Sequence, residues 1–476
     1  MDTLTITESA ESRIFQVAVD SPAPSYFSYL APPDQEVLIG QMVRVPFGVR
    51  ELLGYVMRKD PNPDLSNRKY KLKTISEVVV IEPLFGPDFA ELVDFVAKYY
   101  MYPPGLCVKE ILPGGLSPKL KINYRLSRPD PVQPGTLSEK SQRCLDLLVD
   151  SYPEEVPAAS FSEYRQELLK FVKNGLAEIV YEIDGRSKGF AYEWYLSAVT
   201  DPEAKPKLGQ REKELYELVR NAPPTPLSHY RQIMPNNPLV QAKNLVRKGL
   251  LVMEQRERFR DDPSRALSVP PPNITNLTED QATAVNSISQ ALENNEQKGF
   301  LLFGVTGSGK TEVYLRVAEK TLASGRGVLW LAPEIALTMG LEGRLRERFP
   351  QLPYSILHSA LTPGQRHDHW AALRRGTSRL AMGARSAVFA PITELGLIIV
   401  DEEHDWAYKQ DDGLRYQGRD LAAWRAKASG AVLVLGSATP SLESYHRAKT
   451  GHLTLLRLLG RPGLAVLPEV KLVDLR

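Results

Sequence analysis

A glycine-rich segment at residues 304–311, with the sequence GVTGSGKT, constrains the fold of this chain more than any other feature. It follows the apolar run GFLLF at 299–303 and precedes EVYLRVAEKTL at 312–322, which has helical spacing. A strand, a glycine-rich loop and a helix in this order form a P-loop, in which backbone N–H groups surround a phosphate at the start of a helix. The sequence therefore predicts a parallel α/β lobe that binds ATP at this loop.

The residue types of the P-loop assign a role to each of its members. Lys310 is expected to reach the β and γ phosphates, and the hydroxyl of Thr311 to bind Mg²⁺. The other residues expected to contact the nucleotide are Gly304, Thr306, Gly307, Ser308 and Gly309. ATP and Mg²⁺ are thus the predicted cofactors.

An acidic cluster follows the apolar run LGLIIV at 395–400 and reads Asp401-Glu402-Glu403-His404. A carboxylate at the end of a strand can hold Mg²⁺, and its neighbour can orient the attacking water. We assign Asp401 to the metal and Glu402 to the water, so Lys310, Asp401 and Glu402 form the predicted catalytic set. Alone, the cluster also fits an acidic helix start, but its place about 90 residues after a P-loop favours the metal role.

A third motif, Gly436-Ser-Ala-Thr439, follows the apolar run AVLVL at 431–435. By itself a Ser-Ala-Thr triplet is a weak signal. In order after the P-loop and the acidic cluster, it indicates the first lobe of a superfamily 2 helicase. The fully apolar runs at 300–303 and 328–331 complete a series of buried parallel strands.

The last third of the chain resembles the PriA family, the replication-restart DNA helicases also called primosomal protein N′. The resemblance rests on GVTGSGKTEVYLR, LAPEIALT (331–338), LHS (357–359), GARSAVFAP (383–391), DEEHDWAYKQ and GSATPSLES. It implies recognition of stalled or D-loop forks, ATP-dependent 3′-to-5′ unwinding and primosome assembly. Its implied partners are forked and single-stranded DNA, primosome and helicase-loader proteins, and single-stranded DNA-binding protein, and the family's members mostly act as monomers. The N-terminus lacks a secretory signal, so the cytoplasm is the expected location.

The resemblance also implies roles for residues outside the three motifs. Gln281, in LTEDQ at 277–281, corresponds to a residue that recognises adenine, and Arg385 to one that contacts the DNA backbone, although Ala384 replaces the usual Thr. The segment 405–416 resembles a loop that senses single-stranded DNA. Its rings and cations suit stacking and phosphate contact; they are Trp406, Tyr408, Lys409, Arg415 and Tyr416. Aromatic side chains that pack under a loop are the alternative.

The N-terminal third resembles the family more loosely, through YFSYLAP (26–32) and RVPFG (44–48). In the family this domain binds the 3′ end of a leading strand. The corresponding residues are Phe27, Ser28, Gly48 and Lys73. Ser28 stands where the family has an acidic residue that accepts from the terminal hydroxyl. Ordinary β-barrel residues are the alternative interpretation of this set.

Two Pro-rich stretches, 127–134 and 261–272, divide the chain. Strand-like runs at 14–19, 42–47, 53–57 and 74–81 and a helical pattern from Phe89 to Tyr100 predict a small β-barrel-like domain closed by a helix. The predicted domains are a 3′-end DNA-binding domain at 11–116, a winged-helix DNA-binding region at 135–260, and helicase lobe 1 at 273–476.

The middle region contains a weak internal repeat. FVKNGL at 171–176 and LVRKGL at 245–250 each end an amphipathic helix at a glycine, and a strand-like run follows. This order predicts two winged-helix units or one elaborated unit, with a plain helix-to-strand connection as the alternative. Residues 201–260 hold 12 Lys/Arg against 7 Asp/Glu, whereas the whole chain has a net charge of only +2.

Composition excludes several classes of protein. No apolar run approaches the ~20 residues of a membrane span, and the N-terminus lacks the pattern of a secretory signal. The two cysteines, Cys107 and Cys144, cannot form a zinc site and are expected to be buried. Zinc is expected in the full-length family, but its ligands are not in this sequence.

We expect the 476 residues to lack the family's second helicase lobe and zinc-binding insertion, which makes full helicase activity of this chain alone doubtful. One alternative is a non-catalytic scaffold that binds forks and loads the primosome. A restriction- or repair-type superfamily 2 ATPase is a more remote one. The presence of Lys310, Asp401 and Glu402 favours a motor protein over the scaffold.

Overall fold

The computed structural model describes residues 13–48, 50–60, 72–114, 116, 118–128, 137–184, 191–199, 206–234, 237–258, 260, 276–333, 343–345, 348–349 and 352–460. Most of both predicted linkers, residues 334–338 of LAPEIALT, and the C-terminal residues from 461 lie outside the described residues. The chain forms two compact units, one made of residues 1–187 with 263–476 and the other of residues 188–262.

The N-terminal part is a six-stranded sheet in the order β5-β2-β1-β4-β3-β6. Its strands are β1 (Ile14–Val19), β2 (Phe27–Leu30), β3 (Met42–Phe47), β4 (Arg50–Lys59), β5 (Lys73–Thr74) and β6 (Glu77–Val80). Two helices follow, α2 (Pro87–Tyr99) and α3 (Pro104–Ile111). These elements confirm the predicted β-rich domain with its helix, and Pro87 at the start of α2 fits the helix geometry because its ring presets φ.

One predicted strand of this domain, 74–81, is wrong as a continuous element. The chain leaves β5 at Thr74, and the amide of Ile75 donates to Leu30 O at 2.9 Å. The amide of Ser76 then donates to Arg44 O at 2.9 Å, so the backbone passes from the β2 edge of the sheet to the β3 edge. The apolar pattern continues across this crossing, which is why the sequence did not reveal the break.

Two groups of elements with the same order come next. The first comprises β7 (Lys119–Leu126), α4 (Glu139–Ser151), β8 (Val156–Pro157), η1 (Ala158–Tyr164), α5 (Arg165–Lys173) and β9 (Ala177–Asp184), with sheet order β8-β7-β9. The second comprises β10 (Ala191–Ala198), α6 (Gln210–Arg220), β11 (Thr225–Pro226), α7 (Leu227–Ile233), α8 (Leu239–Arg247) and β12 (Leu251–Arg258), with sheet order β11-β10-β12. The second group lies in the unit 188–262 and has its own hydrophobic core.

The repeated glycines end equivalent helices in these two groups. Gly175 follows α5 with φ +72°, and Gly249 follows α8 with φ +70°. The next amides close the same kind of turn, from Leu176 to Phe171 O at 2.9 Å and from Leu250 to Leu245 O at 3.0 Å. A left-handed residue at this position favours glycine, which has no Cβ to clash.

The C-terminal part is a seven-stranded sheet in the order β15-β16-β14-β17-β18-β13-β19, and its strand pairs are parallel. The strands are β13 (Gly299–Gly304), β14 (Gly327–Leu331), β15 (Tyr354–Leu357), β16 (Leu380–Gly383), β17 (Leu395–Val400), β18 (Val432–Ser437) and β19 (Thr454–Leu458). The helices are α9 (Glu279–Glu293), α10 (Lys310–Ala323), α12 (Pro363–Arg374), η3 (Arg385–Phe389), η4 (Trp406–Tyr408), α13 (Gly418–Ser429) and α14 (Leu442–Lys449). The predicted parallel α/β lobe is confirmed.

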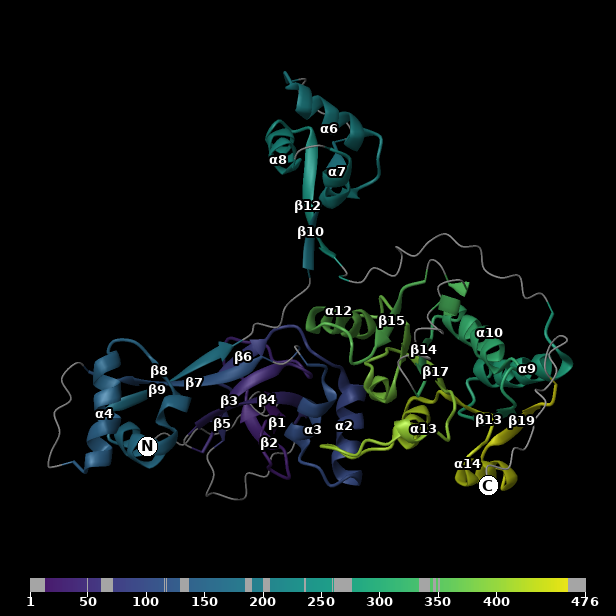
Figure 1. Ribbon diagram of the computed structural model, residues 1–476, viewed down its shortest axis with the longest axis horizontal. Coiled ribbons are helices and arrows are strands. Elements are labelled where there is room, and N and C mark those ends of the chain that lie inside the picture. The colour runs from purple at the N-terminus through teal and green to yellow at the C-terminus, as the bar shows by residue number, and fades with distance from the viewer. Residues whose placement is uncertain are drawn as a thin grey trace, which may run out of the picture. The chain divides into compact units, whose positions relative to one another are not determined.

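Both faces of this sheet are buried, which explains its continuous apolar runs. In β13, Phe300 and Leu302 belong to the core that includes α9 and α10, whereas Leu301 belongs to the core that includes α13. Figure 1 labels these helices and the strand β13. The same alternation holds in β14, β17 and β18. Each buried Leu or Phe contributes roughly 1.5–3 kcal/mol, so the sheet is a rigid platform for the loops at its ends.

The N-terminal domain and the parallel lobe share one hydrophobic core within their unit. Trp370 Nε1 donates to Leu84 O at 2.6 Å, and the rings of Phe95 and Trp424 stack with centroids 4.4 Å apart. The amide of Gln417 donates to the hydroxyl of Tyr100 at 3.1 Å. Among the described residues, no helix is long and apolar enough to cross a membrane.

Candidate functional site

The P-loop joins β13 to α10 and takes a shape that only glycine permits. Gly307 and Gly309 have φ +82° and +87°, in the left-handed region. A Cβ at Gly304 would lie 2.5 Å from Ser308 Oγ. The chain therefore turns tightly and starts α10 at Lys310, so the first turn of this helix lies at the loop.

Lys310 lies inside this loop and is only 8% exposed. Its Nζ donates to Gly304 O at 2.8 Å and lies 3.5 Å from Glu402 Oε1. The adjacent Ser308 Oγ is buried and has no hydrogen-bond partner among the described residues. A buried ammonium beside an unsatisfied hydroxyl suits an anionic ligand such as a phosphate, since each group gains a partner on binding.

Gln281 is placed against the P-loop. Its Nε2 donates to Ser308 O at 2.9 Å, and its Oε1 accepts from the amide of Thr278 at 3.0 Å. Thr278 in turn caps α9, so the helix start holds the loop in position. Recognition of adenine by Gln281 stays a prediction.

Asp401 and Glu402 follow β17, next to Lys310. Asp401 Oδ1 accepts from the hydroxyl of Tyr314 and from the amide of Glu402, both at 3.1 Å. Burial, followed by the negative charge of Glu402, raises the pKa of Asp401 to about 6. Glu402 has φ +44°, a left-handed conformation that costs a non-glycine residue roughly 1–2 kcal/mol. Strain of this kind recurs at functional sites, where the surrounding structure holds it.

The acidic cluster and the Ser-Ala-Thr motif are bonded to each other. His404 Nδ1 lies 2.7 Å from Ser437 Oγ, and its Nε2 lies 3.3 Å from Thr439 Oγ1. The amide of Ala438 donates to Glu402 Oε2 at 3.4 Å. The three motifs identified in the sequence therefore meet at one end of the sheet, since parallel strands end on the same edge.

Glu403 has a structural role that sequence reasoning missed. It is 1% exposed and accepts from Arg419 Nη1 at 3.0 Å and from the amide of Ser441 at 2.7 Å. Ser444 Oγ donates to the same carboxylate at 2.9 Å. Glu403 thus ties the end of β17 to α13 and to the start of α14. The Ser441 cap before a short helix was the available sequence signal.

The predicted DNA-sensing loop contains one exposed ring and two buried rings. Trp406 is 87% exposed, whereas Tyr408 and Tyr416 are 0% and 6% exposed. The Tyr408 hydroxyl donates to Asp401 O at 2.6 Å, which connects the loop to the acidic cluster. Arg415 is exposed and Lys409 is half-buried.

Arg385 lies beneath this loop. Its Nη1 donates to Ala407 O at 3.2 Å and to Lys409 O, and its guanidinium lies 6.0 Å from the Tyr416 ring centroid. In this conformation Arg385 supports the loop backbone. Its contact with DNA stays a prediction, as do those of Trp406, Lys409 and Arg415. The buried rings of Tyr408 and Tyr416 offer no stacking face in this conformation.

Of the four predicted 3′-end residues, Phe27 and Ser28 lie on opposite faces of β2, whereas Lys73 lies in β5 and Gly48 follows β3. The rings of Phe27 and Phe47 pack edge to face at 5.0 Å, and Lys73 Nζ donates to the carbonyl of Gly48 at 3.1 Å. Ser28 is the next residue after Phe27 and therefore points to the opposite face.

Ser28 donates to Asp60 Oδ2 at 2.6 Å, and Asp60 is only 6% exposed. Sequence reasoning missed Asp60, which lies 32 positions away and meets Ser28 only through the pairing of β1 with β2 and β4. Ser28 stands where the family has an acidic residue, and Asp60 places a carboxylate next to it.

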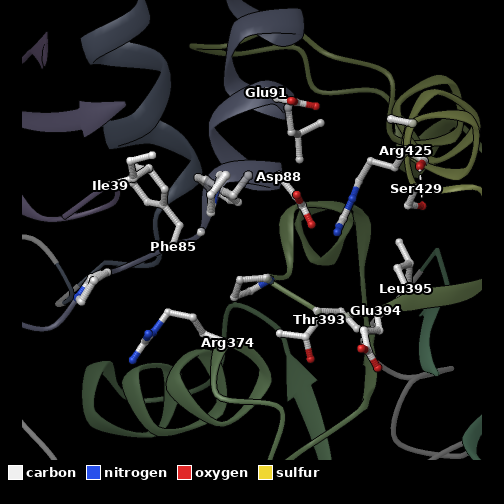
Figure 2. A pocket seen from close by; sticks show the side chains of 18 of the residues that line it. Ile39, Phe85, Asp88, Glu91, Arg374, Thr393, Glu394, Leu395, Arg425 and Ser429 are labelled. Carbon is white, nitrogen blue, oxygen red and sulfur yellow. Dashed lines mark hydrogen bonds between the residues drawn. The ribbon is translucent and has the colours of Figure 1, made fainter. Parts of the chain in front are cut away.

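A cavity of about 1000 Å³ lies at the other end of the parallel sheet, at Leu395, which begins β17, and the preceding Glu394. The N-terminal domain supplies its opposite wall. Figure 2 shows the side chains of Asp88 and Arg425 pointing toward each other across it. Burial lowers the pKa of Arg425 to about 10, and the charge of Asp88 opposes this shift.

No group of three or more His, Cys, Asp or Glu side chains able to hold a metal occurs among the described residues. Mg²⁺ keeps several waters and is bound through one or two carboxylates together with nucleotide phosphates. Asp401 and Thr311 are the residues of this chain that fit such an ion. Both cysteines are buried and free, as predicted.

A P-loop, an acidic strand end and a Ser-Ala-Thr motif on a parallel sheet define the nucleotide-binding lobe of a helicase. The DEAD/DEAH box helicase family model matches residues 278–448. A second family model, the 3′ DNA-binding domain (3′BD) of PriA, matches residues 16–113. The helicase domain implies the use of ATP and Mg²⁺.

Curated relatives match almost the whole chain. Replication restart protein PriA of Bacillus subtilis is 32% identical over 467 residues, which are 94% of this chain and 56% of that protein. The PriA proteins of Synechocystis and Haemophilus influenzae are 32% and 30% identical, over 97% and 98% of this chain and 56% and 54% of those proteins. The chain spans about half the length of these relatives.

These matches, together with both family models, show that the chain belongs to the PriA family of replication restart proteins. Among solved structures, RecG bound to a three-way DNA junction is 23% identical over 40% of this chain and 24% of that chain, with a TM-score of 0.31.

Proposed function

We propose that this chain acts at stalled or D-loop replication forks as part of an ATP-dependent 3′-to-5′ DNA helicase that promotes primosome assembly. One observation carries the proposal. A nucleotide site built from Lys310, Asp401 and Glu402 lies in the same unit as a domain that matches a 3′ DNA-binding family model. Replication restart requires these two functions together, because the protein must recognise a fork and then move along it.

The residues of the ATP site have distinct roles in this proposal. Lys310 binds the β and γ phosphates, Thr311 and Asp401 hold Mg²⁺, and Glu402 orients the attacking water. Bound Mg²⁺ supplies positive charge to the phosphates during hydrolysis. The contact of Lys310 Nζ with Gly304 O and its approach to Glu402 support this arrangement, because a phosphate can replace both partners.

The loop 405–416 is the proposed sensor of single-stranded DNA. Trp406 offers an exposed face for a base, and the exposed Arg415 offers a phosphate contact. Tyr408 carries the signal, since its hydroxyl bonds the carbonyl of Asp401. Arg385 holds the loop through the carbonyls of Ala407 and Lys409, so DNA that contacts Arg385 also changes the loop.

The N-terminal domain is proposed to bind the 3′ end of a leading strand. Phe27 stacks on the terminal base, Gly48 allows the backbone to approach, and Lys73 contacts phosphate. The exposed Lys73 beside Gly48 supports this set. Ser28 bonds the buried Asp60 on the opposite face of β2, so the proposal that it accepts from the terminal hydroxyl is separate from the set formed by Phe27, Gly48 and Lys73.

The middle region is proposed to contain two winged-helix units, one in each group of equivalent elements. The second carries its positive charge on an exposed face. Lys243 and Arg247 are exposed one turn apart on α8, as expected for a helix that enters a DNA groove. The proposed domains are 11–116, 135–260 and 273–476, with the second winged-helix unit in residues 188–262. The proposed protein partners are primosome and helicase-loader proteins and single-stranded DNA-binding protein.

A fork assay tests this function. Fluorescence anisotropy measures binding to a fork with a leading-strand 3′ end at the branch and to one that lacks it, and stimulated ATP hydrolysis is measured alongside. We expect tighter binding to the first fork, with hydrolysis lost and fork binding retained in Lys310→Ala. Fork binding without stimulated hydrolysis by the unmodified chain would mean a recognition and scaffold part that needs a second lobe for hydrolysis. Equal binding to both forks would contradict 3′-end recognition.

A further inference from the structure

Tyr314 lies on α10, one turn after Lys310, and its side chain is fully buried. Its ring packs edge to face against Trp330, with centroids 5.3 Å apart. Its hydroxyl donates to Asp401 Oδ1 at 3.1 Å. Asp401, one of the three proposed catalytic residues, therefore contacts Tyr314, which lies 87 positions away in sequence.

Gly436, at the end of β18, leaves the space that this hydroxyl occupies. A Cβ at Gly436 would lie 1.5 Å from Tyr314 Oη and 2.8 Å from Tyr314 Cζ. The same Cβ would lie 3.5 Å from Asp401 Oδ1. Any side chain at position 436 must displace the tyrosine from the carboxylate. This contact gives a physical reason for the glycine that precedes the Ser-Ala-Thr motif.

The orientation of Asp401 is fixed on one side by these contacts. Oδ1 accepts from both Tyr314 and the amide of Glu402, so the plane of the carboxylate is determined by α10 and by its own backbone. Groups that hydrogen-bond a metal-binding carboxylate orient it and change its affinity for the ion. The ring of Tyr314 cannot rotate away, because Trp330 and the sheet enclose it.

We propose that Tyr314 is a positioning residue that holds Asp401 in the orientation required by the Mg²⁺ of a bound nucleotide, in space that Gly436 leaves open. This role rests on the proposed function of the ATP site. A positioning role and a purely structural role of Tyr314 predict different results. In a positioning role, loss of the hydroxyl raises the Mg²⁺ concentration required for nucleotide binding and leaves the affinity for the nucleotide without Mg²⁺ unchanged.

Tyr314→Phe removes one oxygen atom and keeps the ring. A fluorescent ATP analogue is titrated into the 476-residue chain at increasing Mg²⁺ and, separately, in EDTA. We expect the half-saturating Mg²⁺ concentration to rise about tenfold, the lower end of the effect of outer-shell ligands. Binding in EDTA should be unchanged. An unaltered Mg²⁺ requirement in Tyr314→Phe overturns the proposal.

Tyr230→Phe is the matched control. The Tyr230 hydroxyl is also buried, belongs to the other unit, and has no hydrogen-bond partner among the described residues. Its removal should leave both titrations unchanged. A Mg²⁺ requirement that rises equally in Tyr230→Phe and Tyr314→Phe means a general effect of lost hydroxyls and overturns the proposal.

Gly436→Ala provides a second test through a double-mutant cycle. Alone, it should lower both the melting temperature and the affinity for Mg²⁺, because the methyl group meets the tyrosine oxygen. In the Tyr314→Phe background its effect should be smaller, since that oxygen is gone. An equal effect of Gly436→Ala in both backgrounds contradicts the geometry.

Failure of the ATP-site assignment is distinguishable from failure of this inference. If the unmodified chain does not bind the analogue at any Mg²⁺ concentration, the proposed function fails and the inference fails with it. If the unmodified chain binds in a Mg²⁺-dependent way and Lys310→Ala does not, the ATP site stands. The titration of Tyr314→Phe then decides the inference alone.

Discussion

The proposed ATP site and the proposed 3′-end site are built in different ways. Lys310 and Asp401 are enclosed by the protein and bonded to other groups of their site. Phe27 is half-buried and Lys73 is exposed, and Ser28 points to the other face of the strand. A preorganised, buried site binds a small charged ligand of fixed shape well, because its groups are already oriented and water is excluded. A DNA end, which carries its own stacking surface, can be bound by exposed groups.

The largest expected effect is at the buried site. Lys310→Ala removes a charged hydrogen-bond donor from the phosphate position, and such a bond contributes ~1.5–3 kcal/mol, which corresponds to roughly 10- to 100-fold in affinity. Equilibrium binding of a fluorescent ATP analogue measures this loss. Lys320→Ala, on an exposed part of the same helix, is the control and should bind normally. Equal binding by both variants would mean that the nucleotide lies elsewhere.

Removal of the stacking ring at the exposed site should have a smaller effect. Phe27→Ala removes one base-stacking partner, which is worth ~1–3 kcal/mol, so we expect about tenfold weaker binding to single-stranded DNA with a free 3′ hydroxyl. Anisotropy with the same oligonucleotide blocked by a 3′ phosphate provides the comparison. An equal loss of affinity for the free and the blocked oligonucleotide in Phe27→Ala would contradict a role of Phe27 at the 3′ end.

The Ser28–Asp60 pair separates a structural role from recognition of the DNA end. Ser28→Ala removes the hydroxyl bonded to the nearly buried Asp60, and we expect a loss of about 1–3 kcal/mol in the free energy of unfolding. Urea denaturation measures this loss. If Ser28 accepts from the terminal hydroxyl, the preference for a 3′ hydroxyl over a 3′ phosphate also falls. A loss of stability with an intact preference would contradict that role and leave the pair purely structural.

The thiols should show no reaction in the folded chain. Burial raises the pKa of Cys107 to about 12 and of Cys144 to about 11. At pH 8 both stay protonated in the native state and should resist alkylation until the chain unfolds. The unfolded thiols ionise near pH ~8.5, so their contribution to stability is present below that pH and is lost as pH rises toward the folded pKa. Mass spectrometry after brief alkylation, with and without urea, checks this. Rapid native labelling would contradict the burial.

The sequence predicted that the P-loop, the acidic cluster and the Ser-Ala-Thr motif lie at strand ends, because each motif is contiguous and follows an apolar run. A run of apolar residues marks β17, and Asp401 must then lie at the same sheet edge as the P-loop. Contacts between distant segments were not predictable. Tyr314 meets Asp401 only through the packing of α10 on the sheet, and Ser28 meets Asp60 only through strand register.

The rings of the loop 405–416 show the same limit. Its composition predicted three stacking surfaces, but the structure buries Tyr408 and Tyr416. Tyr408 is buried because its hydroxyl bonds the carbonyl of Asp401, and Tyr416 because it packs against Phe389 with centroids 4.9 Å apart. Composition gives the chemistry that a loop can offer, whereas tertiary packing decides which side chains face solvent.

The most direct test asks whether the DNA-binding and ATP-binding regions act together. The affinity of the chain for a Mg²⁺-bound fluorescent ATP analogue is measured with and without saturating forked DNA. Because the loop contacts both Asp401 and, through Gln417, Tyr100 of the N-terminal domain, we expect DNA to change this affinity at least about fivefold, the lower end of typical coupling. The change should shrink in Trp406→Ala. The same affinity with and without bound DNA would contradict the account.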